Sequence, residues 1–307
     1  MEYILRTFDL CKRYKNKLVL NCVNMNIRRG DIYGFVGENG SGKTTVIRLI
    51  TGLIFPTSGS YELFGVSSVS GDLTKIRRKV GAIVESPSIY LNFTAKENIE
   101  FQCDLLGLEK TEDIVKGLLK EVGLGDLYDS PKKAGDFSLG MRQRLGIAMT
   151  LVGDPEFLIL DEPLNGLDPA GIVEIRELIL KLNQEKKITF LISSHLLSEL
   201  SLVANTYGMI SKGHIVKEIS VDELSKECRP YVEVTTDDPA KLYYTLKTTY
   251  PCEIKALPYG MIIYHDGHLN EILEDILKTG VKIEALKTSN VNIEEYYLSV
   301  VGGVRYE

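Results

Sequence analysis

The sequence predicts an α/β fold with a largely parallel sheet for about the first two-thirds of the chain, followed by a small α+β domain. Three observations support this prediction. Short apolar runs alternate with helical patterns up to roughly residue 220, a glycine-rich loop follows one of these runs, and a different order of elements begins near Pro230. Alternating strands and helices are typical of parallel sheets, because parallel strands need crossover connections.

Three apolar runs predict buried strands at residues 32–36, 157–160 and 188–192. Parallel strands are covered on both faces, so continuous apolar character is expected of them. Between the first two runs, residues 94–122 predict a helical region, with Thr94 and Glu97 in the spacing of a capping box. We expect this region to form a helical insert rather than part of the sheet.

The last part of the chain predicts a separate domain. Its predicted strands and helices occupy residues 231–234, 239–249, 253–257, 261–264, 269–278 and 281–286, before a last helix at 293–301. Pro258-Tyr259-Gly260 indicates a hairpin between the two middle strands, and Gly280 closes a helix. The order βαββαβ is that of a ferredoxin-like unit. We place the boundary near Cys228-Arg229-Pro230.

Composition and charge exclude several classes of protein. The net charge is −6, so no strong basic field favours binding of nucleic acid. The five cysteines form no CxxC pair, which argues against a disulfide framework or a zinc site and fits a reducing cytosol. We expect neither a signal peptide nor a membrane span, because no apolar run reaches the ~18 residues that a spanning helix needs.

The most specific motif is the run Gly37-Glu38-Asn39-Gly40-Ser41-Gly42-Lys43-Thr44, which matches G-x-x-x-x-G-K-[ST] in full and leads into a helix from Thr45. Glycines let backbone N–H groups turn inward around phosphate oxygens at a helix N-terminus. Lys43 adds a positive charge for the β- and γ-phosphates, and Thr44 offers a hydroxyl to Mg²⁺. The motif therefore predicts binding of ATP with Mg²⁺.

An acidic pair, Asp161-Glu162, follows the apolar run at residues 157–160. In open α/β sheets, ligands sit at the carboxyl ends of the strands, so this strand brings the pair to the phosphate loop. We expect Asp161 to hold Mg²⁺, directly or through water, and Glu162 to orient and deprotonate the attacking water.

Four more features follow a fixed order along the chain: Tyr14, Phe137-Ser138-Leu139-Gly140-Met141, Asn165-Gly166-Leu167-Asp168 and His195. Together with the phosphate loop and the acidic pair, they resemble the ATP-binding subunit of an ABC transporter. The resemblance implies that Tyr14 stacks on adenine, that Asp168 couples two sites across a dimer, and that His195 is the switch histidine at the γ-phosphate.

The run from Phe137 to Met141 stands where the family has its LSGGQ signature. Ser138 predicts an N-cap, and a helix N-terminus presents free amides suited to a γ-phosphate. The resemblance implies that Ser138 and Gly140 reach the ATP bound to the opposite subunit, in a head-to-tail dimer with two composite sites. Leu139 and Met141 depart from the signature, which leaves the details of the partner contact open.

Glu85 is the most informative departure, because the family usually has glutamine at this position. A glutamate here resembles the subgroup of bacitracin- and lantibiotic-resistance ATPases. A carboxylate is at least as good a ligand for Mg²⁺ as an amide oxygen. We therefore hypothesise that Glu85 ligates Mg²⁺ and makes closure of the dimer more dependent on the metal.

These features predict an ABC ATPase domain at residues 1–228, with a helical insert at about 87–150, and an accessory domain at 229–307. The expected reaction is ATP hydrolysis that drives transport, with export of a peptide antibiotic or drug as the first choice. The expected partners are separate transmembrane permease subunits and a second ATPase, with a homodimer as the first expectation. We expect the chain to lie in the cytoplasm, attached to the inner face of the membrane by its permease. The alternatives left open are an ATPase of the same superfamily acting in translation or DNA repair, and a different P-loop enzyme such as a nucleotide kinase.

Overall fold

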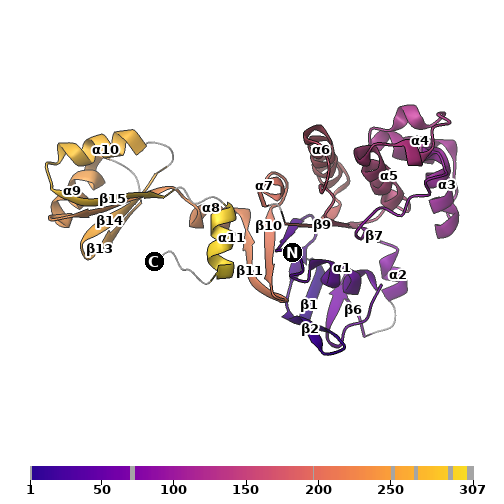
Figure 1. Cartoon of the computed structure of the whole chain (residues 1–307), viewed down its shortest axis with the longest axis horizontal. Coiled ribbons are helices and arrows are strands. Elements are labelled where there is room, and N and C mark those ends of the chain that lie inside the picture. The colour runs from indigo at the N-terminus through magenta and orange to yellow at the C-terminus, as the bar shows by residue number, and fades with distance from the viewer. Residues whose placement is uncertain are drawn as a thin grey trace. The chain divides into compact units, whose positions relative to one another are not determined.

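The computed structural model describes residues 2–69, 73–195, 197–249, 253–265, 269–289 and 293–302. The chain divides into two compact units, Met1–Ser220 and Val221–Glu307 (Figure 1). The boundary expected from the sequence lies near residue 228, whereas here helix α8 (Val221–Glu227) falls within the second unit.

The first unit is built on a six-stranded sheet in which the neighbouring strands β10, β4, β9, β8 and β7 are parallel and β11 pairs antiparallel at one edge. The predicted apolar runs form its central strands, and their residues are all buried. The predicted α/β fold is therefore confirmed. The bounds are β4 (Ile32–Val36), β7 (Val80–Ile83), β8 (Phe157–Asp161), β9 (Thr189–Ser194), β10 (Thr206–Ser211) and β11 (His214–Ser220).

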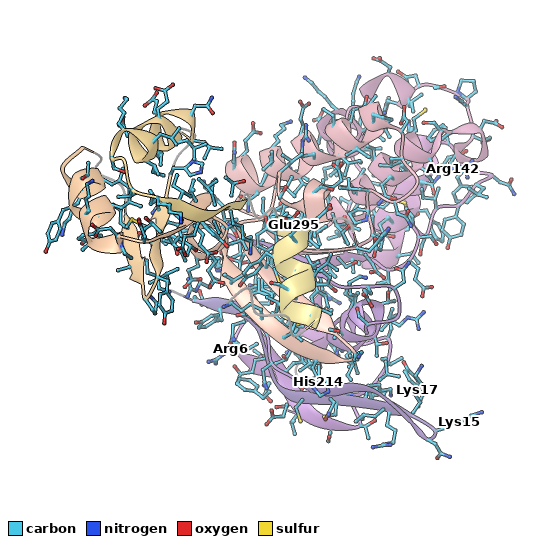
Figure 2. All side chains as sticks on the ribbon, turned by 60° about the vertical axis from the view of Figure 1, so that its left-hand side comes forward. Arg6, Lys15, Lys17, Arg142, His214 and Glu295 are labelled. Atoms are coloured by element: carbon cyan, nitrogen blue, oxygen red, sulfur yellow. The ribbon has the colours of Figure 1, made fainter. Side chains whose placement is uncertain are left out.

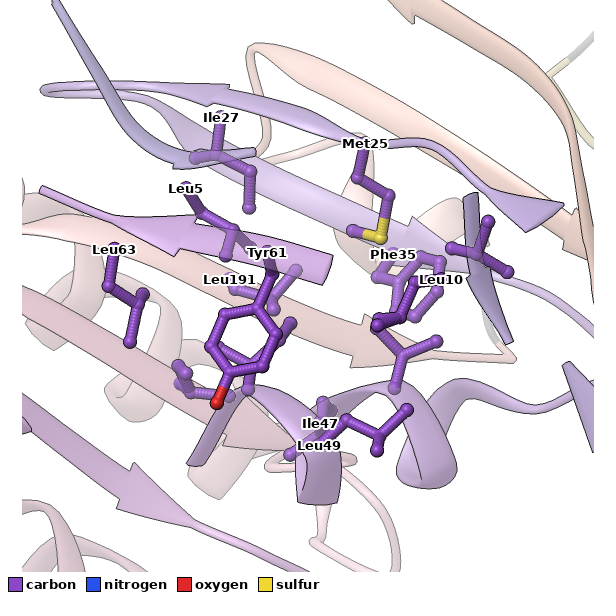
Figure 3. Close-up of a cluster of buried hydrophobic side chains, with 14 of the residues drawn as sticks. Leu5, Leu10, Met25, Ile27, Phe35, Ile47, Leu49, Tyr61, Leu63 and Leu191 are labelled. Carbon is purple, nitrogen blue, oxygen red and sulfur yellow. The ribbon is translucent and has the colours of Figure 1, made fainter. Parts of the chain in front are cut away.

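A second, antiparallel sheet packs near the first and was not part of the sequence prediction. It consists of β1 (Tyr3–Tyr14), β2 (Lys17–Val23), β3 (Asn26–Arg28), β5 (Ser58–Leu63) and β6 (Val66–Ser67). Figure 3 shows buried side chains from both sheets and from helix α1 (Lys43–Thr51) in one cluster, including Leu10, Met25, Phe35 and Ile47. This core fixes α1 and the loop before it against both sheets.

The helical region predicted at residues 94–122 consists of two helices, α3 (Ala95–Leu106) and α4 (Glu112–Glu121). The chain turns at Gly107, whose φ of 67° is the left-handed conformation that glycine adopts at low cost. The capping box is confirmed, because Thr94 Oγ1 accepts from the Glu97 amide at 3.2 Å and Glu97 accepts from the Thr94 amide at 2.6 Å.

Helix α5 (Leu139–Leu151) gathers with α3 and α4 at one end of the first unit (Figure 1). Helix α6 (Pro169–Lys186) links β8 to β9, and the shorter helices are α2 (Leu73–Arg77) and α7 (Leu197–Leu200). Two 3₁₀ turns, Gly125–Leu127 and Ala134–Asp136, connect α4 to α5.

The second unit contains an antiparallel sheet in the order β13-β14-β12-β15, with the element order predicted for a ferredoxin-like fold. Helices α9 and α10 supply Leu242, Leu246, Ile272 and Ile276 to its core. Its last strand covers Ile283–Ser289, later than the predicted 281–286, since the turn closed by Gly280 (φ 67°) is followed by two residues outside any strand, Val281 and Lys282. The bounds are β12 (Tyr231–Thr236), α9 (Pro239–Thr249), β13 (Ile254–Leu257), β14 (Gly260–Tyr264), α10 (Leu269–Lys278), β15 (Ile283–Ser289) and α11 (Ile293–Gly302).

In the described part of the chain, no helix combines the length and the apolar character that crossing a bilayer requires.

Candidate functional site

The phosphate loop runs from the end of β4 at Val36 to the start of α1 at Lys43. Gly40 and Gly42 have φ angles of 79° and 117°, in the region that favours glycine. A Cβ atom at Gly37 would lie 2.5 Å from the carbonyl oxygen of Ile210 on β10. Glycine is therefore required at these positions by backbone conformation and by close packing, and the loop keeps the shape that turns amides inward.

Lys43 is held in the loop by its ammonium group. Its side chain is 6% exposed, and Nζ lies 3.3 Å from Glu162 Oε1. Nζ also donates to the carbonyl oxygens of Gly37, at 2.6 Å, and Glu38, at 3.3 Å. A charge this deeply buried needs such partners, since desolvation without them is costly. The lysine is thus fixed at the mouth of the loop, beside the acidic pair.

One buried polar atom of the loop has no partner. Ser41 Oγ is buried without a hydrogen-bond partner among the described residues, which is rare for a buried hydroxyl. A phosphate oxygen would satisfy it, so the loop fits an anionic ligand.

No group of three or more His, Cys, Asp or Glu side chains in the described residues could hold a metal ion by itself. The oxygen donors of Thr44 and Asp161 nevertheless suit Mg²⁺, which usually takes one or two carboxylates together with substrate phosphates.

Asp161 is the last residue of β8 and Glu162 follows it, and Ser193 of β9 positions both. Ser193 Oγ donates to Asp161 Oδ1 at 2.5 Å and accepts from the Glu162 amide at 2.9 Å. The Glu162 amide also donates to the Ser193 carbonyl at 3.2 Å. These bonds hold Glu162 at a φ of 50°, which is an unfavourable conformation for a residue with a side chain. No motif in the sequence indicates this role of Ser193, because only the pairing of β8 with β9 places it there.

His195 lies at the end of β9, and its Nδ1 is 2.8 Å from Glu162 Oε2. Glu162 therefore bridges Lys43 and His195 with its two carboxylate oxygens. The three side chains come from the carboxyl ends of β4, β8 and β9, which are neighbours in the sheet. This is the edge at which open α/β sheets bind ligands. A lysine, a carboxylate and an imidazole at the phosphate loop can orient a water against a terminal phosphate.

Glu85 follows β7 on the same sheet, and its described ion pair is with a residue of α1 rather than with the acidic pair. Its carboxylate pairs with the guanidinium of Arg48 on α1, and the side chain is 60% exposed. Its φ of 64° lies in the left-handed region, which marks a sharp turn at this point of the chain. No motif in the sequence indicates a role for Arg48. In this structure it is the residue that holds Glu85.

The signature and the Asn165-Gly166-Leu167-Asp168 loop lie beside each other. Ser138 caps α5 by accepting from the Met141 amide at 3.2 Å, and Asp168 caps α6 by accepting from the Gly171 amide at 3.3 Å. A Cβ atom at Gly166 would lie 3.3 Å from Leu139 Cδ2. Among the described residues, no hydrogen bond or ion pair joins either capping residue to Lys43, Glu162 or His195.

Tyr14 is the last residue of β1, and its side chain is 41% exposed. The ammonium of Lys12 lies 5.1 Å from the centre of its ring. An exposed aromatic face at a strand end is available to stack on a planar base. No described contact joins Tyr14 to the phosphate loop.

The comparisons with known proteins agree with this geometry. The family model described as ABC transporter matches residues 20–165. The chain is 40% identical over 99% of both lengths to the bacitracin transport ATP-binding protein BcrA of Bacillus licheniformis. It is 44% identical to the lantibiotic transport ATP-binding protein SrtF of Streptococcus pyogenes, over 71% of this chain and 92% of that protein.

A solved structure similar to the first unit is the dimeric ATP-binding cassette MJ0796 bound to ADP and Pi. It has a TM-score of 0.63 and 26% identity, and the match covers 71% of this chain and 98% of that one. The alternative of a non-transport ATPase is not favoured, because the relatives that match the full length and carry a function in their names are transport ATP-binding proteins. The chain belongs to the family of ABC transporter ATP-binding proteins, and it is an ATP-hydrolysing subunit of that kind.

Proposed function

We propose that one ATP lies along the carboxyl edge of the main sheet, with its adenine on Tyr14 and its phosphates in the loop before α1. The N-terminus of α1, which has no side-chain cap, and the Ser41 hydroxyl, which has no partner among the described residues, support the position of the phosphates. Lys43 would exchange its bonds to loop carbonyls for the β- and γ-phosphates, at little cost, because it is already held there. The residues proposed to contact nucleotide in this chain are Tyr14, Gly37, Glu38, Asn39, Gly40, Ser41, Gly42, Lys43, Thr44 and Thr45.

Thr44 and Asp161 would hold Mg²⁺, and the metal would neutralise charge on the phosphate oxygens when it is bound. Glu85 is proposed as a third ligand. Because its carboxylate pairs with Arg48, that ion pair has to open before Glu85 can turn toward a metal. The hypothesis of Glu85 as a ligand therefore requires a movement of the loop after β7 when nucleotide binds.

Hydrolysis is proposed to depend on Glu162 as general base and on His195 as the group that orients it. The observation that carries this proposal is the bridge from Lys43 through Glu162 to His195. When phosphate draws Lys43 away, Glu162 Oε1 is released to accept a proton from water, while His195 still holds Oε2. A general base has to lie within hydrogen-bond reach of the proton that it removes.

Two copies are proposed to complete two sites, with Ser138 and Gly140 of each copy facing the γ-phosphate held by the other. Asp168 would stabilise the contact between the two copies. The exposure of Ser138 and Leu139 at the N-terminus of α5 supports this arrangement, because a partner can reach them there. Because the two copies would be related by a two-fold axis, each would use the same surface, and the assembly would end at a homodimer.

A permease segment is proposed to dock in a groove of about 450 Å³ between the main sheet and the helices of the insert. Residues of β7, the loop after Glu85, α3 and α5 line it, including Ser86, Gln102 and Met149. The occupant would be a short helix in a cytoplasmic loop of the permease, which would place this chain on the inner face of the membrane. Movement of the Glu85 loop on ATP binding would then act on that helix directly.

The transported substrate is proposed to be a peptide antibiotic, moved outward. This proposal rests on similarity to the bacitracin and lantibiotic transport proteins and on Glu85. Expression of the chain together with its permease should raise resistance to bacitracin or to a lantibiotic. Unchanged resistance to both classes would contradict this substrate assignment without affecting the ATPase assignment.

The nucleotide site is tested by Glu162→Gln, which keeps the size of the side chain and removes the base. With MgATP, the variant should elute from gel filtration as a dimer, because ATP closes the pair and hydrolysis no longer opens it. Ser201→Ala, a substitution at an exposed position, is the control and should behave like the wild type. A Glu162→Gln variant that binds ATP and remains a monomer would contradict the two-copy site.

The docking groove is tested separately by Leu106→Asp, a change in α3 at its rim. Co-purification with the permease should be lost while ATP binding persists. Leu202→Asp, at an exposed leucine away from this groove, is the matched control. Retained co-purification of the Leu106 variant would argue against the groove as the permease site.

A further inference from the structure

Two cysteines face each other beside Tyr14, on the paired strands β1 and β2. Cys11 Sγ and Cys22 Sγ are 3.9 Å apart, and the Cys22 amide donates to Cys11 Sγ at 3.1 Å. Cys22 is exposed and Cys11 is partly buried. Both are free thiols, and neither belongs to the nucleotide site described above.

The backbone brings these two side chains together through a bulge. Leu10 pairs with Val23 and Lys12 pairs with Leu20, so one residue of β1 faces two residues of β2 between these pairs. Cys22 has a φ of 51°, the left-handed conformation that is uncommon for residues other than glycine. A regular ladder would not need this conformation, and bulges of this kind re-aim a side chain.

The surroundings of Cys11 favour its reactive form. Although partial burial raises the pKa of the Cys11 thiol, hydrogen bonds from the Cys22 amide and the Ser58 hydroxyl lower it below its ordinary value. The pKa of the Cys22 thiol is raised, first by its hydrogen bond with Cys11. Of the two thiols, Cys11 is therefore the one that loses its proton more readily, and the thiolate is the nucleophile in disulfide exchange.

We propose that Cys11 and Cys22 form a reversible disulfide by exchange with a small oxidised disulfide, and that this bond weakens ATP binding at Tyr14. The Cys11 thiolate attacks one sulfur of the small disulfide, forms a mixed disulfide and releases one small thiolate. The Cys22 thiolate then attacks Cys11 Sγ and expels the second one. The protein loses two electrons and two protons, and the small disulfide is reduced to two thiols.

The coupling to nucleotide rests on the proposed stacking role of Tyr14. The new bond would close a covalent loop that contains Tyr14, and Figure 2 shows its neighbours Lys15 and Lys17 at the tip of this hairpin. The two sulfurs have to approach from 3.9 Å to about 2 Å. A second irregularity, between Lys12 and Arg13, lies directly before Tyr14 and is the place where the strand can absorb that shift.

The test begins with full-length protein equilibrated in buffers of reduced and oxidised glutathione. Non-reducing peptide mass spectrometry should find Cys11 linked to Cys22, and dithiothreitol should reverse the link. In Cys22→Ser, glutathione should remain attached to Cys11, because the resolving thiol is absent. Cys228→Ser, at a thiol of the second unit, is the matched control and should not affect the link.

The functional arm compares ATP affinity of the oxidised and reduced protein by calorimetry. We expect at least a threefold weaker affinity after oxidation, and no further effect of oxidation in a Tyr14→Ala background. Absence of the Cys11–Cys22 link across the glutathione series would overturn the site. A link with unchanged or tighter ATP binding would overturn the coupling. Failure of the reduced protein to bind ATP would instead contradict the proposed nucleotide site.

Discussion

Ser193→Ala is the substitution that most directly tests how the fold prepares the acidic pair. Ser193 is fully buried, and its hydroxyl donates to Asp161 at 2.5 Å while it accepts from the Glu162 amide at 2.9 Å. Alanine fits the same space and removes only the oxygen. The variant therefore separates the positioning of two carboxylates from the packing of β8 against β9.

The expected effect on stability follows from these bonds. A hydrogen bond to a charged group is worth about 1.5–3 kcal/mol, and the Asp161 carboxylate, 3% exposed, would lose this donor without access to water. The Glu162 amide keeps its hydrogen bond to the Ser193 carbonyl at 3.2 Å, so losing the hydroxyl as an acceptor costs this amide less free energy. We expect the free energy of unfolding to fall by about 2–4 kcal/mol.

The expected effect on catalysis is a selective loss of kcat. Without the hydroxyl, the Glu162 amide keeps only its bond to the Ser193 carbonyl, so the backbone at this unfavourable φ is held less firmly and the carboxylate shifts from the position that faces the phosphate loop. A loss of about 2 kcal/mol of transition-state stabilisation corresponds to a kcat about 30-fold lower. The KM for ATP should change less than threefold, because the loop amides and Lys43 are untouched.

Steady-state phosphate release at several ATP concentrations measures both constants, and thermal unfolding gives the stability. Ser193→Thr keeps the hydroxyl and should restore much of kcat, while Ser201→Ala should match the wild type. A Ser193→Ala protein with wild-type kcat and a lowered melting temperature would show that Ser193 serves stability alone. The positioning argument would then be refuted.

Three further substitutions test the phosphate loop, the cap of α3 and a buried carboxyl group. Gly37→Ala should abolish ATP binding in calorimetry, since its Cβ would lie 2.5 Å from the Ile210 carbonyl oxygen; wild-type affinity would contradict the role of this close packing. Thr94→Ala should lower the unfolding free energy by about 1 kcal/mol in a urea titration, through loss of the α3 cap, and an unchanged value would count against it. Burial raises the pKa of the Glu218 carboxyl, so the folded protein binds that proton more tightly and loses stability as pH rises above the range of an unfolded carboxyl group. The difference in unfolding free energy between Glu218→Gln and the wild type should therefore favour the variant more at pH 8 than at pH 4. A difference that does not change with pH would exclude this linkage.

The sequence by itself determined the features whose geometry is local. The phosphate loop, the cap at Thr94, and the N-caps at Ser138 and Asp168 all depend on residues within a few positions of one another. The buried strands were predictable because parallel strands need apolar residues on both faces. The order of elements likewise predicted the fold of the second unit.

Only the tertiary structure decided which distant residues meet. The twelve residues of β1 pair with three different strands through several bulges, so no regular alternation marked the antiparallel sheet in advance. Ser193 reaches Asp161 only because β8 and β9 are neighbours, and Arg48 takes the carboxylate of Glu85 across 37 positions of sequence. Motif spacing specifies which chemical groups a site contains. Their partners follow from strand order and packing, which no single segment of the chain encodes.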